Sequence, residues 1–483
     1  MDYTDSNLCY ISAVEAIELF KTKELSPVEL MNAVIDRAER VNPTLNCWTY
    51  EYFERAFEQA QAAAEVYAKS PESARALEGI PTAIKDFHDV AGEITTYASV
   101  PFENHRPAKT APTVQRLLDA GAIMHFRSTT SEFAYDGVGQ SRLWGTTPNP
   151  WNTQFGPGGS SAGAGAAVAA GLTTIADGTD GGGSIRIPAS ACGVVGYKPP
   201  LGRNPGDHEH PGEPVLMYGP IARSLGDAAL MQNVMSGQHP ADLNSLRDTV
   251  TIPTSPALPG SVEGKRIALS MNLGYVPVTP EVENQTFAAA KTFETLGCSV
   301  DQVDLNWDWG ILSAWHANWE GIFWASMGDT YEAWQYEMEP LVVDVIKRGK
   351  QRTVKEFYAV NRVRYDMYLK LGEIFKNYDA LICPTLATPA LSVDHRSDIS
   401  DRDFEVAGRR VPSYLGWTLT YQFNLLNQLP VVSVPSGFSQ ETGVPIGLQI
   451  VGHAYDDLSV FALASAFEAA DPWRQHTPSA LGT

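Results

Sequence analysis

Apolar residues recur at spacings of three and four positions in the first seventy residues, which predicts two amphipathic helices. The first begins at Ser26-Pro27-Val28-Glu29, a capping box with proline at the first helical position, and the second is expected over residues 51–69. Further helices are expected at residues 113–120, 280–296, 353–375 and 458–470.

Short apolar runs alternate with these helices and are typical of buried strands. They occupy residues 80–84, 122–126, 172–176, 265–270, 381–382, 431–434 and 446–451. Strands that alternate with helices of this length indicate an α/β fold built in layers.

Two Gly-Ser clusters dominate the stretch from Gly156 to Gly196. Between them, the alanine-rich residues 162–171 predict a helix, and residues 172–177 predict an extended return. A helix followed by such a return brings Ser184 back close to Ser160. We therefore expect the two serines to meet at one end of this helix and strand.

Three glycines directly precede Ser184. Because they lack Cβ atoms, their N–H groups can turn inward around a bound oxygen, as an oxyanion hole requires. A serine beside such a nest is a candidate nucleophile, and a nucleophilic serine needs a base. Lys85 ends the apolar run of residues 80–84. Burial lowers the pKa of a lysine, so its neutral amine is a candidate proton acceptor.

The segments GIPTAIKD (79–86), PGGSSAG (157–163) and TDGGGSIRIPAS (179–190) together resemble the amidase signature family. The similarity is close over residues 79–237 and looser over residues 379–473, which contain PTLATPA, FNLLNQLPVVSVPSGF and GVPIGLQIVG.

The resemblance implies a lysine, a serine preceded by a cis peptide bond and a nucleophilic serine, which are Lys85, Ser160 and Ser184 in this sequence. It implies an oxyanion loop formed by Gly181, Gly182 and Gly183. Residues 129–137 resemble the family loop that lines the substrate pocket, although an ordinary connection with its aromatics in the core is the alternative. The candidate substrate-binding residues are Tyr135, Gly137, Ser161 and Ile185.

The fold implied for residues 1–483 is a single compact α/β domain, with a central mixed β-sheet covered on both faces by helices. We expect a helical part (1–70), a catalytic core (79–237), a helical region (about 300–375) and a C-terminal part of the core (376–473). The implied reaction is hydrolysis of a linear carbon–nitrogen amide bond through an acyl-enzyme, on a small apolar or aryl amide. Ester or carbamate cleavage is chemically reasonable at the same site, and neither a cofactor nor a metal is expected.

More than half of the eleven tryptophans lie between Trp307 and Trp334. Trp315 and Trp319 are four positions apart, so part of this region forms one face of a helix. Two interpretations stay open: the aromatic residues pack the helix onto the core, or they form a lid over an apolar substrate cleft.

The net charge of −21 argues against nucleic acid or an anionic membrane as a partner. The five cysteines are widely spaced and odd in number, which favours a reduced, cytoplasmic protein. We see no signal peptide at the N-terminus, and residues 162–176, the longest uncharged run of small residues, are too short for a membrane span. A monomer or homodimer is expected.

Three alternatives remain. Residues 159–163 also fit G-x-S-x-G, the nucleophile elbow of an α/β-hydrolase-type esterase, with Ser161 as nucleophile and His453 as a partner. A glutaminase-type subunit of an amidotransferase complex is the second. The third is a metal site at His208-Glu209-His210, against which stands a solvated loop, because no further ligands have suitable spacing.

Overall fold

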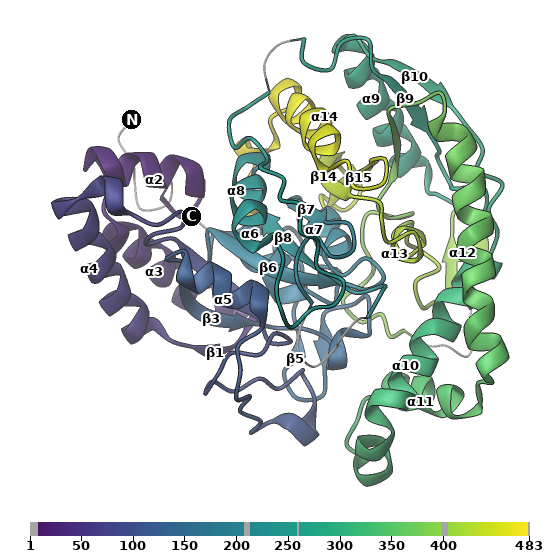
Figure 1. The fold of residues 1–483 in the computed structure, drawn as a ribbon, viewed down its shortest axis with the longest axis horizontal. Helices are drawn as coiled ribbons and strands as arrows, with labels where there is room; N and C mark the ends of the chain where they lie inside the picture. The colour runs from purple at the N-terminus through teal and green to yellow at the C-terminus, as the bar shows by residue number, and fades with distance from the viewer. Residues whose placement is uncertain (1–7, 207–212, 258–259, 398–403, 482–483) are drawn as a thin grey trace.

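An eleven-stranded sheet runs through the part of the chain that the structure describes, residues 8–206, 213–257, 260–397 and 404–481 of a computed structural model (Figure 1). In sheet order the strands are β1 (Trp48–Glu51), β3 (Ile123–Ser128), β2 (Pro81–Lys85), β6 (Ile175–Asp180), β8 (Met217–Ala222), β7 (Val195–Lys198), β14 (Val431–Phe438), β15 (Pro445–Val451), β11 (Ala380–Pro384), β9 (Arg266–Leu269) and β10 (Ser299–Gln302). Two small hairpins, β4–β5 (Gln140–Ser141, Gly145–Thr146) and β12–β13 (Phe404–Val406, Arg409–Val411), lie outside it.

The sheet is mixed. β2 pairs in parallel with β3 and β6, whereas the strands from β6 through β8, β7 and β14 to β15 are antiparallel. Because parallel neighbours end at the same edge of a sheet, the C-terminal ends of β2 and β6 lie together. These two ends carry Lys85 and the residues that lead into the second Gly-Ser cluster.

Helices flank this sheet on both faces, which confirms the predicted fold class. They are α2 (Ala13–Thr22), α3 (Pro27–Leu45), α4 (Phe53–Lys69), α5 (Pro112–Asp119), α6 (Ala162–Ala170), α7 (Arg186–Cys192), α8 (Leu225–Met235), α9 (Pro280–Thr295), α10 (Gly310–Trp334), α11 (Pro340–Gln351), α12 (Val354–Phe375), α13 (Gln422–Leu425) and α14 (Asp457–Ala470). On one face α6 packs against α7, and on the other α5, α8, α14 and α9 contact one another in series. The long α12 stands at the edge of the molecule, in contact with α10 (Figure 1).

The first two predicted helices are present, with one shifted boundary. Ser26 and Glu29 form the predicted capping box of α3. α4 begins at Phe53 rather than at residue 51, because residues 48–51 form the edge strand β1 and pair with β3.

α6, with the sequence AGAGAAVAA, is buried over its whole length. A helix that is apolar on every face belongs in the interior. Its glycines permit close contact with neighbouring backbone: a Cβ atom on Gly163 would lie 2.2 Å from the carbonyl oxygen of Cys47. The small residues therefore set α6 deep in the molecule, directly behind the first Gly-Ser cluster.

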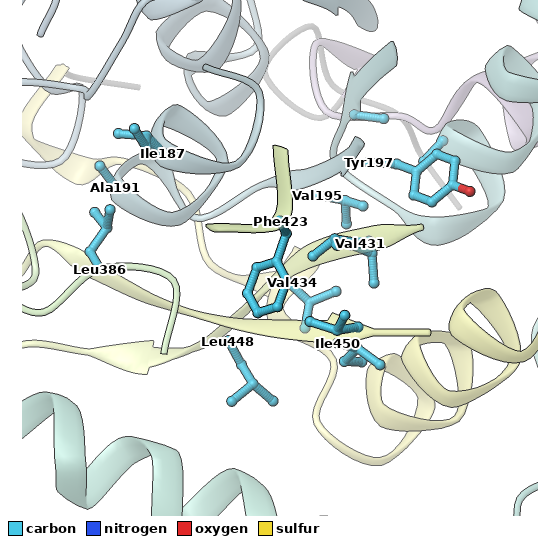
Figure 2. Close-up of a cluster of buried hydrophobic side chains, with 14 of the residues drawn as sticks. Ile187, Ala191, Val195, Tyr197, Leu386, Phe423, Val431, Val434, Leu448 and Ile450 are labelled. Atoms are coloured by element: carbon cyan, nitrogen blue, oxygen red, sulfur yellow. The ribbon is translucent and has the colours of Figure 1, made fainter. Parts of the chain in front are cut away.

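Apolar side chains from α7, β14 and β15 form the centre of the core (Figure 2). The labelled members are Ile187 and Ala191 of α7, Val195 and Tyr197 of β7, Leu386, Phe423 of α13, Val431 and Val434 of β14, and Leu448 and Ile450 of β15. This cluster fixes α7, which directly follows Ser184, against the C-terminal strands.

The strand predicted at residues 172–176 is displaced toward the C-terminus: β6 spans Ile175–Asp180. Its last four residues, Asp177-Gly178-Thr179-Asp180, do not look like a buried strand because a polar side chain is costly to bury without a partner. The partners come from distant elements, so the sequence pattern does not show them.

Among the described residues we find no helix with the length and apolar character of a membrane span. The candidate metal ligands His208, Glu209 and His210 lie outside the described residues.

Candidate active site

Lys85 is completely buried at the C-terminal end of β2. Its Nζ donates hydrogen bonds to Ser160 Oγ at 2.8 Å and to Thr179 Oγ1 at 2.7 Å. A neutral amine has two N–H groups and one lone pair. With Thr179 as an acceptor on one side, the lone pair of a neutral Lys85 can receive the proton of Ser160.

Burial lowers the pKa of Lys85 to about 7, and the nearby carboxylates of Asp177 and Asp180 limit that shift. Asp177 Oδ1 also accepts the main-chain N–H of Lys85 at 2.7 Å. Burial raises the pKa of Asp177 to about 7, so burial favours the neutral form of both groups. Lys85 can therefore exchange a proton near neutral pH.

A second lysine, Lys198, shows that burial alone does not make a base. It too is fully buried, and burial lowers its pKa to about 7. Its Nζ donates to the carbonyl oxygens of Pro199 and Leu429, at 3.2 and 2.7 Å. Carbonyls have no proton to give, so only Lys85 is set up for transfer with a hydroxyl group.

The two Gly-Ser clusters come together, as the sequence predicts. The main-chain N–H of Ser161 donates to the carbonyl oxygen of Ser184 at 3.2 Å. The peptide bond between Gly159 and Ser160 is cis. Ser160 and Ser161 are fully buried, whereas Ser184 retains 8% of its surface exposed, so Ser184 is the one of the three that can meet a substrate.

In the described part of the chain, the main chain of residues 181–183 accepts hydrogen bonds only at its carbonyl oxygens, and we find no partner for its N–H groups. The indole N–H groups of Trp315 and Trp319 donate to Gly181 O, Thr420 Oγ1 donates to Gly182 O, and the N–H of Ile187 donates to Gly183 O. Gly183 has a φ of +128°, which glycine tolerates and other residues rarely adopt. The N–H groups of this loop thus remain available for a bound oxygen.

A buried charged network anchors the loop at residues 181–183. Asp180 accepts hydrogen bonds from Arg186 Nη2 at 2.8 Å and from the N–H of Ile185 at 3.2 Å. Asn424 Nδ2 donates to the same carboxylate at 2.9 Å. All of these groups are fully buried, and a buried network with its bonds satisfied is rigid.

An aromatic cavity opens beside Ser184. α10, the loop after β3 and residues 414–415 all contribute to its lining. Its lining includes Phe87, Phe133, Tyr135, Gly137, Thr179, Gly181, Gly182, Ile187, Leu216, Trp315, Trp319, Ile322, Phe323, Met327, Tyr414 and Leu415. Such a cavity suits an apolar group on the substrate.

The amidase family model matches residues 29–461. The chain belongs to the amidase family. It is a hydrolase that acts on carbon–nitrogen amide bonds. It is 34% identical to an acylamidase from Rhodococcus erythropolis, covering 99% of this chain and 98% of that one. It is 32% identical to a glutamyl-tRNA(Gln) amidotransferase subunit from Thermosynechococcus vestitus, covering 94% and 97%. The crystal structure of a bacterial aryl acylamidase superposes with a TM-score of 0.88 at 31% identity, covering 96% and 97%.

Two of the four candidate substrate-binding residues of this amidase line the cavity. Tyr135 stacks on Tyr414 with ring centroids 5.2 Å apart, and Gly137 lies at the cavity wall. Ser161 and Ile185 are fully buried and do not belong to the lining. Both directly follow a predicted catalytic serine, and adjacency along the chain does not put a side chain on the surface of the cavity.

The alternative nucleophile Ser161 is not brought together with His453. His453 Nε2 lies 2.9 Å from the carbonyl oxygen of Tyr378, and its imidazole stacks on Phe375 of α12. Ser161 lies instead at the start of α6, where a Cβ atom on Gly178 would be 2.9 Å from its Oγ. The arrangement that a nucleophile elbow needs is therefore absent from these two described residues.

Sequence reasoning missed two polar residues of the amidase site, Asp177 and Thr179. They are two positions apart on β6 and both contact Lys85. The polar pair inside an otherwise apolar neighbourhood, two and four residues before the glycines of the loop, was the available signal. In the tryptophan region, Trp307 packs on Phe423 in the core, as the packing interpretation expects, and Trp315 and Trp319 line the cavity.

Proposed function

We propose that this amidase cleaves small amides with an apolar or aryl group, and that Ser184, Ser160 and Lys85 carry the reaction. The single observation that supports this most is the buried hydrogen bond between Lys85 Nζ and Ser160 Oγ, next to a partly exposed Ser184. A base, a relay and an accessible hydroxyl then follow one another toward the aromatic cavity.

In the proposed mechanism, Ser184 Oγ attacks the carbonyl carbon while its proton passes to Ser160 Oγ. Ser160 in turn gives its own proton to the neutral amine of Lys85. The negative oxygen of the tetrahedral intermediate is bound by N–H groups of the loop at residues 181–183. The carbon–nitrogen bond then breaks, the relay returns the proton to the leaving amine, and the acyl group stays on Ser184. Water repeats the relay and releases the acid.

The cavity favours this substrate class. Its lining includes the aromatic rings of Trp315, Trp319, Phe323, Tyr135 and Tyr414, which pack on one another. Burial of a ring or alkyl group against them is favourable by about 25 cal/mol for each Å² removed from water. In this proposal α10 acts as the wall or lid of the acyl or aryl pocket, and esters and carbamates of similar shape are cleaved as well.

A fluorophosphonate tests the nucleophile. Intact-mass and peptide mass spectrometry of the treated enzyme should give one adduct, on Ser184, and Ser184→Ala should prevent it. Ser184→Ala should also lower kcat by several orders of magnitude, as loss of a serine nucleophile does. An adduct on Ser161 would contradict the proposal and restore the elbow as the mechanism.

A glutaminase-type subunit is the second candidate, because the chain is 32% identical to a subunit of glutamyl-tRNA(Gln) amidotransferase. The aromatic walls argue for the free hydrolase, since the side chain of glutamine offers them only a short apolar stem. Purified alone, the chain should hydrolyse an aryl amide without ATP, tRNA or a second protein. Activity confined to glutamine and dependent on a partner would favour the amidotransferase role instead.

A further inference from the structure

Two tryptophans of α10 contact the glycine loop at one atom. Trp315 Nε1 donates to Gly181 O at 2.9 Å, and Trp319 Nε1 donates to the same oxygen at 3.3 Å. Both indoles are buried, with 3% and 7% of their surfaces exposed. Two convergent donors on one carbonyl hold it more firmly than one does.

We propose that Trp315 and Trp319 are positioning residues for the oxyanion site. The proposal deepens the proposed function and rests on it. In a trans peptide the C=O and the N–H point in opposite directions. Fixing the carbonyl of Gly181 therefore fixes the direction of the N–H of Gly182. Thr420 Oγ1, 2.6 Å from Gly182 O, fixes the N–H of Gly183 in the same way.

The packing removes the freedom that a glycine loop would otherwise have. A Cβ atom on Gly181 would lie 2.6 Å from Cζ2 of Trp319, and one on Gly182 would lie 2.8 Å from Cζ2 of Trp315. The indoles thus lie directly against the loop backbone. Their contact stops the two peptide groups from rotating toward α10, and donors held in place are what makes an oxyanion site effective.

The same indoles line the cavity, so the residues that would contact the substrate also hold the catalytic loop. A substrate group packed against Trp315 and Trp319 keeps the two N–H groups over Gly181 O. The binding energy of that group then stabilises the transition state and raises kcat. A small substrate that leaves the cavity empty should therefore have a lower kcat.

Trp315→Phe, Trp319→Phe and the double variant test the role, because phenylalanine keeps an aromatic wall but has no N–H. The probes are phenyl-trifluoropropanone, a ketone that Ser184 converts to a tetrahedral oxyanion, and the corresponding alcohol, which has the same shape without a carbonyl. Loss of an oxyanion donor lowers kcat by about 10²–10³-fold, so we expect kcat of the double variant to fall by about 10–100-fold.

The affinity for the ketone should fall by the same factor. The affinity for the alcohol and KM should change by less than about threefold, because the packing of the wall changes only modestly. Each single variant should lose less, because one donor remains.

Two controls separate positioning from packing. Trp334→Phe changes an exposed tryptophan at the end of α10 and should leave the rates and the thermal midpoint unchanged. Phe323→Leu alters the cavity wall without a bond to the loop, so ketone and alcohol affinities should fall together. If the double variant does not fold, the two single variants provide the same comparison at the carbonyl of Gly181.

Unchanged preference for ketone over alcohol in the double variant, or in both single variants if the double variant does not fold, would overturn the positioning role. Equal loss of both affinities would also overturn it and reduce the tryptophans to wall residues. In either case, the proposed function still stands if the wild-type enzyme forms the fluorophosphonate adduct on Ser184 in the same experiments. Absence of that adduct in the wild type would overturn the proposed function and this inference with it.

Discussion

At the scale of single residues, the proposed proton relay depends on the environment of one amine, that of Lys85. The pKa of Lys85 falls to about 7 because the amine is fully buried, and Thr179 and Ser160 are its only side-chain hydrogen-bond partners among the described residues. Asp177, Asp180 and Arg127 are the charged groups around it. Each prediction at this scale follows from the direction of that shift.

The first residue-scale prediction is a pH profile. A base must be neutral, and an amine whose pKa is lowered to about 7 loses its proton as the pH rises through 7. kcat/KM should therefore rise from pH 6 to pH 8 and then level off. Lys85→Arg should lose as much activity as Lys85→Met, because a guanidinium keeps its proton. The exposed Lys376→Arg is the control, and a largely active Lys85→Arg enzyme would exclude lysine as the base.

The second concerns Thr179→Val, which removes a hydroxyl without a change of shape. The ammonium form of Lys85 gains more from this acceptor than the amine does, so its loss lowers the pKa of Lys85 further. The rise of kcat/KM should occur at a lower pH. The plateau should fall by about tenfold, part of the 10²–10⁴ that general base catalysis supplies, because the lone pair is less well directed at Ser160. Thr295→Val changes an exposed threonine of α9 and should change neither quantity. A shift of the profile to higher pH would contradict the argument.

At the scale of elements, the site lies where four segments end or begin: the ends of β2 and β6 and the starts of α6 and α7. The parallel pairing of β2 and β6 places two of them together, and the short helices α6 and α7 pack side by side and bring back the other two. The glycine loop between β6 and α7 is enclosed by α10. Two contacts therefore restrict which residues this loop can hold: the oxyanion that it is proposed to bind, and the indoles of α10 that pack against it.

The prediction at this scale is the effect of one methyl group. In Gly182→Ala the new Cβ would lie 2.8 Å from Trp315, so the loop or α10 must shift. Overpacking of this kind costs about 1–3 kcal/mol of stability. kcat should fall at least about tenfold, as expected for a displaced oxyanion donor. Thermal unfolding and steady-state kinetics measure both effects.

Gly372→Ala is the matched control. Gly372 lies in α12, where a Cβ atom would meet nothing within 4 Å. Alanine is favoured over glycine in a helix interior by about 0.5–1 kcal/mol, so this variant should be slightly more stable and fully active. Equal behaviour of the two variants would show that the loop tolerates a side chain.

At the scale of the whole molecule, all five cysteines are buried. Burial raises the pKa of Cys47, Cys192 and Cys383, which keeps these thiols protonated and unreactive. With Ellman's reagent the native protein should release less than one equivalent over minutes, and all five thiols should react in guanidinium chloride. Activity and thermal midpoint should not depend on a reductant. Rapid reaction of a thiol in the native protein would mean that the structure around that cysteine opens readily to solvent.

The sequence by itself determined the outline of this protein. Periodicity and caps located α3, α4, α5, α9, α12 and α14, because local propensity and one buried face suffice to define a helix. The motifs around Lys85, Ser160 and Ser184 indicated the family, and the helix-and-return path between the serines follows from the geometry of elements in sequence.

Only the tertiary structure decided the rest. β6 continues through Asp177 and Thr179 because Lys85, from another strand, satisfies them. Trp315 and Trp319 reach Gly181 across more than 130 positions of the chain. Ser161 and Ile185 follow the two proposed catalytic serines yet are buried and do not line the cavity. A buried polar group or a tryptophan N–H needs a hydrogen-bond partner, and the fold can supply that partner from any part of the chain. Spacing along the sequence therefore does not predict which residue it is.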